Sequence, residues 1–175
     1  MDMSKIAIGK NPPEDINVII EIPMGGDPVK YEVDKASGAL FLDRITHAGM
    51  RYPCNYGFVP HTLSEDGDPV DVLVVAPYQF YPLSVVRCRP IGVLMTEDEK
   101  GGDEKIIAVP DDKVYPRYAG IRECTDLPEI QRQEIQHFYE HYKDLEKGKW
   151  VKVTEWGDAA AAKAVILQSI ERYKK

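Results

Sequence analysis

The segment E-D-G-D-P-V-D, residues 65–71, places four acidic side chains within seven positions and runs directly into the apolar stretch V-L-V-V. No Lys or Arg occurs between Arg51 and Arg87 to neutralise these charges. Carboxylates packed this closely repel one another and raise one another's pKa, so we expect a cation among them. The segment contains oxygen ligands but no His or Cys, which favours Mg²⁺, Mn²⁺ or Ca²⁺ over zinc.

The spacing within residues 65–71 narrows the kind of cation site that this segment can form. Gly67 and Pro69 predict a tight turn that holds Asp66 and Asp68 close together. Asp71 opens the apolar strand that follows, which should draw its carboxylate out of water and makes a purely solvated acidic turn the weaker alternative. An EF-hand calcium loop is excluded by register, because the sixth position counted from Asp66 is Asp71 where that loop requires Gly.

A second acidic segment, E-D-E-K-G-G-D-E-K at residues 97–105, is by itself typical of a charged hairpin tip. It becomes informative only if it folds against the first acidic segment. Candidate cations are Lys30, Arg44 and Lys143, although each alone is more often a surface charge. Lys30 and Glu32 fall on the same face of a predicted strand, so an amine and a carboxylate should point into the same space.

Three further features of the sequence bear on other possible functions, and none of those functions is supported. H-F-Y-E-H at residues 137–141 matches the inverted zinc-protease motif, but only 34 residues follow it, and core or surface histidines explain it better. Gly25 and Gly26, followed by Lys30, do not spell a P-loop, and no dinucleotide fingerprint is present. The formal net charge of −7 argues against general nucleic-acid binding.

The elements that must position these residues are mostly strands, followed by helices. The stretch at residues 51–61 is rich in aromatics and Pro and is expected to be irregular, and Pro90 should break the strand that contains it. Strands are predicted at residues 17–23, 29–33, 39–44, 70–76, 84–95, 106–109 and 150–156, and helices at residues 128–147 and 158–173.

This order predicts an α+β fold, mostly β, as one domain over residues 1–175, with a sheet or small barrel and helices packed to one side. No apolar run is long enough to span a bilayer, and the first ten residues lack a secretory signal, so we expect a cytoplasmic protein without a membrane partner. Cys54, Cys88 and Cys124 are odd in number and fit neither a disulfide framework nor a zinc site, so buried reduced thiols are expected.

The motif E-D-G-D-P-V-D-V-L-V resembles the hallmark of the family I soluble inorganic pyrophosphatases, and the similarity continues along nearly the whole chain. It includes the V-K-Y-E strand, D-R, M-R-Y-P-x-N-Y-G-F-V-P, R-C-R-P-I-G-V-L, H-Y-K-D-L-E-K-G-K-W and the closing W-G-D helix. The ordered set is most similar to the bacterial type. The resemblance implies a five-stranded OB-like barrel flanked by two main helices, a homohexamer, and several Mg²⁺ per subunit.

The resemblance also implies a role for individual residues in hydrolysing pyrophosphate to two phosphates. Asp68 matches the general base. Metal ligation is assigned to Asp66, Asp71 and Asp103, with Asp98 at a further metal and Glu32 acting mainly through metal-bound water. The phosphates are held at the positions of Lys30, Arg44, Tyr56, Lys105, Tyr142 and Lys143.

These roles agree with the chemistry, because bound Mg²⁺ can acidify a water and attract the anion that the acidic loops alone would repel. Two alternatives stay open from the residues themselves. One is a metal-binding OB-like module without catalysis, which would need basic and aromatic residues across one sheet face. The other is a metal-dependent phosphohydrolase that acts on nucleotides, although no base-stacking pocket is evident in the sequence.

Overall fold

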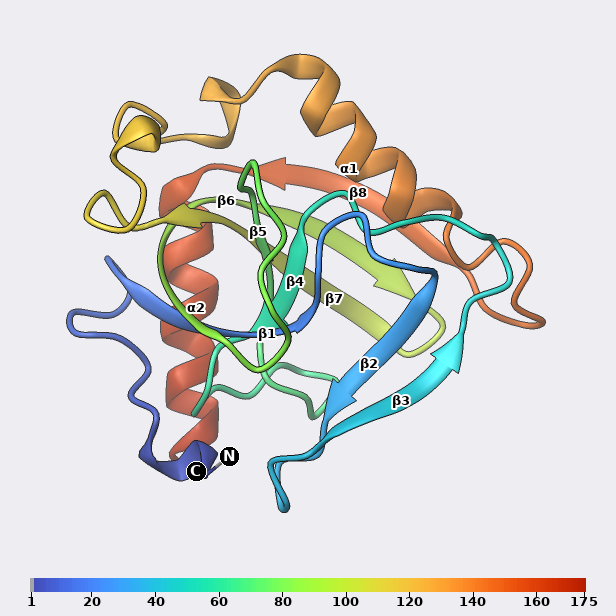
Figure 1. Ribbon diagram of the computed structural model, residues 1–175, viewed down its shortest axis with the longest axis horizontal. Helices are drawn as coiled ribbons and strands as arrows, with labels where there is room; N and C mark the ends of the chain where they lie inside the picture. Colours follow the sequence, from blue (N-terminus) through green and yellow to red (C-terminus); the bar gives the residue numbers. More distant parts are fainter. Residues whose placement is uncertain (1) are drawn as a thin grey trace.

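The chain folds around a ring of five strands (Figure 1), in a computed structural model that describes residues 2–175. The ring strands pair in the order β1–β4–β5–β7–β6, and β6 returns to pair with β1, so this part of the sheet has no free edge. Neighbours are antiparallel except β5 and β7, which run parallel. The five strands are β1 (Ile16–Ile22), β4 (Asn55–Phe58), β5 (Asp71–Val74), β6 (Val85–Asp98) and β7 (Gly101–Pro110).

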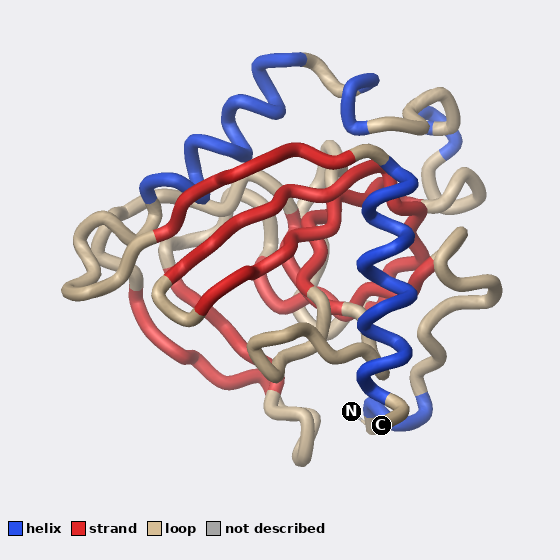
Figure 2. The backbone as a smooth tube through the Cα atoms, turned by 180° about the vertical axis from the view of Figure 1, so that it is seen from behind, coloured by secondary structure: helices blue, strands red, loops and turns tan. Residues whose placement is uncertain are grey.

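The remaining elements surround this barrel. Strand β8 (Val151–Gly157) pairs with β6 outside the ring, and β2 (Val29–Val33) and β3 (Leu40–Ile45) form a separate two-stranded sheet. Helix α2 (Ala159–Tyr173) crosses the barrel strands, as seen from behind in Figure 2, whereas α1 (Glu129–His141) packs against β8. Short 3-10 turns lie at Met3–Lys5, Pro116–Tyr118 and Cys124–Asp126. The predicted α+β class with a five-stranded OB-like barrel and two main helices is confirmed.

Both faces of the central strands are buried, which explains their nearly continuous apolar sequence. In β5, Val72 and Val74 join a core cluster with Ala162 and Ile166 of α2. Leu73 between them points the other way and belongs to a second cluster, which contains the α1 residues Ile135 and Phe138. Because successive strand residues face opposite sides, the two helices cover the two faces of one strand layer. The expectation that the helices pack to one side is therefore wrong.

Two expectations about strands are wrong. Residues 51–61 are not irregular throughout, because Asn55–Phe58 forms β4 and pairs with both β1 and β5. Pro90 does not break its strand, since β6 continues to Asp98 with only a register shift between Pro90 and Gly92. That irregularity accommodates a residue that has no backbone N–H to donate.

The first helix is shorter than its apolar pattern predicts. It begins after Pro128 and ends at His141, and the residues up to Gly148, where φ is +76°, form turns. Ile135 and Phe138 are buried, but the apolar residues Ile130 and Leu145 in the range predicted as helix are 62% and 66% exposed. Because the helix ends at His141, Tyr142 and Lys143 lie in the turns that follow it, and both line the pocket described below.

The remaining expectations concern the state of the three cysteines and the absence of a helix that could span a membrane. Cys54, Cys88 and Cys124 are all buried and none is in a disulfide, as predicted. Burial raises the pKa of the Cys54 thiol to about 12, which keeps that thiol protonated and unreactive at neutral pH. Within residues 2–175, neither α1 nor α2 has the length and apolar character needed to cross a bilayer.

Close packing of β4 on β1 provides a test of this fold. A Cβ added at Gly57 would lie 2.0 Å from the backbone oxygen of Ile19, so Gly57→Ala forces the two strands apart. We expect it to destabilise the protein by about 3 kcal/mol, measured by chemical denaturation. Gly120→Ala is the matched control, since a Cβ there meets nothing within 4 Å and should change stability by less than about 0.5 kcal/mol. Equal stability of the two variants would contradict this packing.

Candidate active site

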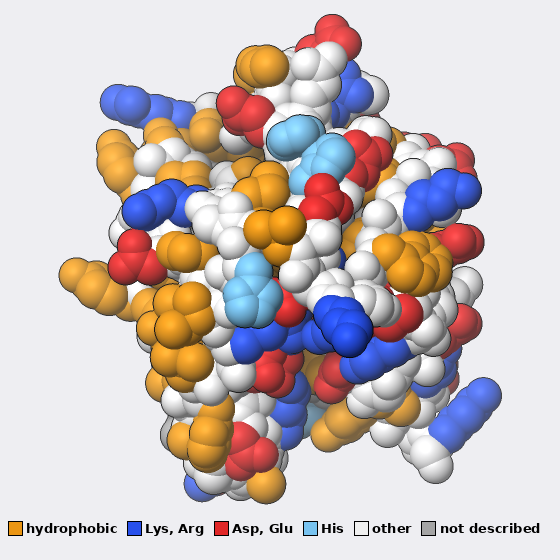
Figure 3. Space-filling model, turned by 90° about the vertical axis from the view of Figure 1, so that its right-hand side faces the viewer, with side chains coloured by type: hydrophobic (Ala, Val, Ile, Leu, Met, Phe, Trp, Pro, Cys, Tyr) orange, Lys and Arg blue, Asp and Glu red, His pale blue; other side chains and the backbone are white. Residues whose placement is uncertain are grey.

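One pocket brings together every residue assigned to the site from the sequence. The pocket lies where the barrel, the β2–β3 sheet and the turns after α1 meet. Figure 3 looks onto that side of the molecule and shows Lys and Arg side chains interspersed with Asp and Glu. Its walls include Lys30, Glu32, Arg44, Tyr56, Asp66, Asp68, Asp71, Asp98, Asp103, Lys105, Tyr142 and Lys143.

The centre of the pocket is a buried ammonium between two carboxylates. Lys105 Nζ donates to Asp71 Oδ2 at 2.6 Å and to Asp103 Oδ1 and Oδ2 at 2.7 and 2.6 Å. The strands dictate this contact, because β5 and β7 pair with Asp71 directly opposite Lys105. Burial alone would lower the pKa of Lys105, but the charges of Asp71 and Asp103 raise it well above its usual range. The ammonium is therefore held in its charged form.

A second ion pair joins the β6–β7 hairpin to the turn after α1. Lys143 Nζ donates to Asp98 Oδ2 at 2.8 Å and lies 3.7 Å from Glu99 Oε2. Burial opposes the charge on Asp98, yet the bond from Lys143 lowers the pKa of this carboxyl below its ordinary value. The second acidic segment does fold against the first, because Asp98 and Asp103 line the same pocket as Asp66 and Asp68. It is therefore more than a charged hairpin tip.

The β2–β3 sheet supplies cations from the opposite wall. Lys30 and Arg44 are direct cross-strand partners. Lys30 makes an ion pair with Glu32 on its own strand, and Asp43 lies 3.4 Å from Lys30 Nζ and 3.2 Å from Arg44 Nη1. Asp43 thereby holds the two cations beside each other.

The first acidic segment forms a tight loop between β4 and β5. Asp66 Oδ1 accepts the backbone N–H of Asp68 at 3.0 Å, and Gly67 between them has φ +93°, a conformation that favours glycine. Desolvation raises the pKa of Asp66, and the neighbouring carboxylates of Asp103 and Asp68 add to this effect. The repulsion expected among these acids thus contributes to the raised pKa of Asp66, although burial contributes more.

The two predicted tyrosines form part of the pocket wall. Tyr56 is on β4 and is 9% exposed, and Tyr142 follows the end of α1. Burial raises the pKa of Tyr142 to about 12 and that of Tyr56 well above its usual range. Both hydroxyls remain protonated at neutral pH, so each can donate a hydrogen bond to an anion.

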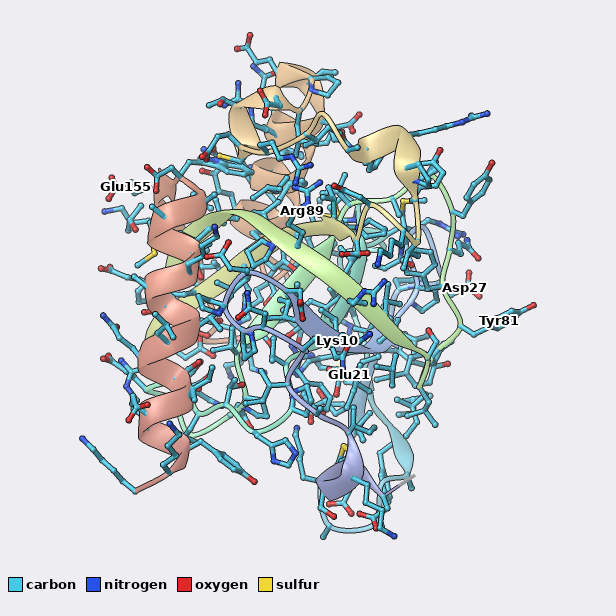
Figure 4. The ribbon with its side chains drawn as sticks, turned by 90° about the vertical axis from the view of Figure 1, so that its left-hand side faces the viewer. Lys10, Glu21, Asp27, Tyr81, Arg89 and Glu155 are labelled. Atoms are coloured by element: carbon cyan, nitrogen blue, oxygen red, sulfur yellow. The ribbon has the colours of Figure 1, made fainter. Side chains whose placement is uncertain are left out.

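Sequence reasoning missed several lining residues, and Glu21 is the most informative of them. It is a single acid within the apolar strand β1, 4% exposed, and it accepts the backbone N–H of Val33 at 2.7 Å. Figure 4 shows Glu21 within the body of the molecule, whereas Tyr81 projects outward. The single acid in the otherwise apolar run V-I-I-E-I-P could have identified Glu21 from the sequence. The other missed residues include Lys35, Tyr52, Glu99, Tyr139 and Lys149.

The donor chemistry of the pocket fits a hard divalent cation. Asp66, Asp71 and Asp103 offer only carboxylate oxygens, and Mg²⁺ prefers such ligands. Lys105 Nζ contacts both Asp71 and Asp103, so those two carboxylates already converge on one cation. Over residues 2–175, no three acidic, His or Cys side chains already stand in the arrangement of a metal site, and the Lys105 ammonium lies between Asp71 and Asp103.

The environment of Glu21 predicts a specific dependence of stability on pH. Burial, with smaller contributions from Asp71, raises its pKa from 4.5 to about 7. The folded protein therefore retains a proton that the unfolded chain releases, and stability should fall as pH rises from about 4.5 to 7. Without divalent cations, wild type should lose on the order of 3 kcal/mol over this range relative to Glu21→Gln, measured by urea unfolding. Parallel curves for the two proteins would contradict the raised pKa.

Known proteins are similar to this chain in both sequence and fold. The model of the inorganic pyrophosphatase family matches residues 18–174. An inorganic pyrophosphatase of Mesorhizobium japonicum is 61% identical over all 175 residues and 99% of its own length. A crystal structure of an inorganic phosphatase from Anaplasma phagocytophilum has a TM-score of 0.96 at 50% identity, covering 98% of this chain and 100% of that one. The inorganic pyrophosphatase of Thermus thermophilus has a TM-score of 0.94 at 46% identity, with both chains covered completely.

The motifs that resembled family I are thus part of a match that extends over almost the entire chain and its fold. The matched range includes the twelve predicted site residues, from Lys30 to Lys143. This chain belongs to the inorganic pyrophosphatase family.

Proposed function

We propose that this chain, as a single domain over residues 1–175, hydrolyses pyrophosphate to two orthophosphates with Mg²⁺ as cofactor. The observation that carries this proposal is the shared pocket of carboxylates and cations. Carboxylates alone would repel a polyanion, and cations alone would not activate water. The two sets together suit an anhydride whose hydrolysis needs both charge neutralisation and a nucleophile.

The carboxylates are proposed to divide the binding of metal among them. Asp66, Asp71 and Asp103 would hold Mg²⁺, with Asp98 at a further ion and Glu32 acting through water. When bound, Mg²⁺ supplies Lewis-acid chemistry that acidifies a water and offsets the negative charge of the phosphates. Each of these acids already accepts a bond from a cation or from a backbone N–H group.

Asp68 is proposed to accept the proton of the attacking water on a carboxylate oxygen. Its side chain is exposed at the edge of the pocket, and no other described residue forms an ion pair with it. Asp71, Asp98 and Asp103, in contrast, are each bonded to a lysine. Asp68 therefore has its lone pairs available, while the tight turn at Gly67 keeps it beside Asp66.

The cations and hydroxyls are proposed to hold the two phosphates. Lys30 and Arg44 approach from the β2–β3 sheet, and Lys105 and Lys143 from the barrel and the turn after α1. Each phosphate can thus meet donors from opposite walls, which fixes the anhydride bond relative to Asp68 and stabilises the leaving phosphate. Tyr56 and Tyr142 add neutral donors between these cations.

The resemblance also supports a homohexamer that acts in the cytoplasm, without nucleic acid or membrane partners. Exposed apolar side chains on β3 are compatible with subunit contacts: Phe41, Leu42 and Ile45 are 57%, 56% and 64% exposed. Sedimentation velocity measures the mass of the assembly directly.

One assay tests the proposed reaction and separates it from its rivals. We expect phosphate release from pyrophosphate to require Mg²⁺ and to exceed release from ATP by at least roughly 100-fold, because the cations and hydroxyls of the pocket are donors for phosphate groups. Binding of a ligand without phosphate release would favour a non-catalytic module. Equal rates with ATP would indicate a nucleotide phosphohydrolase.

Loss of the proposed base should remove catalysis selectively. Asp68→Asn keeps the size of the side chain but cannot accept the proton, so kcat at saturating Mg²⁺ should fall by roughly 10²–10⁴-fold. Circular dichroism and the melting temperature should be unchanged, because no described residue pairs with this carboxylate. Asp27→Asn is the control, an exposed aspartate paired with Arg51 at the surface, and should retain full turnover. Normal turnover in Asp68→Asn would rule out the general-base role.

A further inference from the structure

Tyr139 has an oxygen that the fold buries but does not use. The residue lies on α1, is 1% exposed, and its hydroxyl has no hydrogen-bond partner within residues 2–175. The other buried side-chain polar atoms without a partner in this range are arginine Nε atoms, which belong to groups with further donors. A buried hydroxyl without a partner is unfavourable, and phenylalanine would fill the same space without that disadvantage.

The position of Tyr139 connects this hydroxyl to the active site. Tyr139 is part of the pocket wall, and the Lys105 ammonium lies over its ring, 5.9 Å from the centroid. Its ring also meets that of Tyr142 edge to face, with centroids 5.6 Å apart. Both Lys105 and Tyr142 are among the groups proposed to hold phosphate, so Tyr139 lies directly behind the substrate donors.

The electrostatic surroundings define what this hydroxyl can do. Burial raises the pKa of Tyr139 well above its usual range, and the nearby hydroxyls of Tyr52 and Tyr142 and the charge of Asp71 raise it further. The group stays protonated at any physiological pH and can donate a hydrogen bond. The natural acceptor in a pocket of lysines is an anionic oxygen.

We propose that the Tyr139 hydroxyl is a further substrate-binding group, which donates a hydrogen bond to a phosphate oxygen on the side of the pocket behind Lys105. The class of ligand rests on the proposed function. The hydroxyl is closed to solvent, and the long, flexible side chain of Lys105 lies over the ring. When a phosphate draws that ammonium toward itself, the hydroxyl gains access to the same anion.

The isosteric variant Tyr139→Phe tests this role with inorganic phosphate as the probe. In the presence of Mg²⁺, the variant should bind phosphate roughly tenfold more weakly by calorimetry, the change expected for a hydrogen bond to a charged group. KM for pyrophosphate should rise more than kcat falls. The metal-free protein should melt at the same or a higher temperature, because the variant removes a buried hydroxyl without a partner. Tyr118→Phe, a half-buried tyrosine outside the pocket, is the control and should bind phosphate like wild type.

Equal affinities would overturn the proposal, and the melting temperature would then show what the hydroxyl does instead. Equal phosphate affinity in Tyr139→Phe and wild type would show that the hydroxyl does not meet the ligand. A lower melting temperature with unchanged affinity would show that it serves the fold, through a partner such as a bound water. Calorimetry needs no turnover, so a failed hydrolysis assay would contradict the proposed function alone, whereas equal affinities would contradict the role of Tyr139 alone.

Discussion

The ammonium of Lys105, buried between Asp71 and Asp103, is the interaction on which the rest of the site depends. A buried charge is tolerated only when opposite charges and hydrogen bonds compensate its lost hydration. The parallel pairing of β5 with β7 places Asp71 opposite Lys105, and this pairing exists because β6 carries the chain back across the barrel. The strand pairing that closes the barrel therefore also brings the charged residues at the centre of the pocket together.

The same logic resolves the apparent conflict between an acidic protein and an anionic substrate. The net charge of −7 describes the whole chain, but the pocket combines carboxylates with lysines and an arginine that come from six strands and from the loops and turns between elements. Ion pairs such as Lys143 with Asp98 hold each side chain in place while keeping both charges available at the pocket. Under the proposed function, a metal ion and a phosphate would replace these internal partners.

Much of this arrangement was predictable because local patterns and tertiary contacts agree. Alternation in β2 placed Lys30 beside Glu32, and the turn at Gly67 placed Asp66 beside Asp68. The predictions were wrong where long-range packing outweighed the local sequence pattern. β4 exists because Gly57 permits close approach to β1, and β6 passes through Pro90 because a register shift absorbs the missing donor. The end of α1 at His141 was likewise not visible in the apolar spacing of residues 128–147.

By itself the sequence determined the types and spacing of the charged residues, and from these it predicted a hard-cation site on a mostly β domain and a resemblance to a known family. Only the tertiary structure decided which side chains are buried at the pocket. Glu21 is marked in the sequence as the single acid of β1, but nothing local shows that Tyr139 of α1 lies buried in the pocket wall. Burial and its effect on pKa depend on segments far apart in the chain, because desolvation is a property of everything packed around a group.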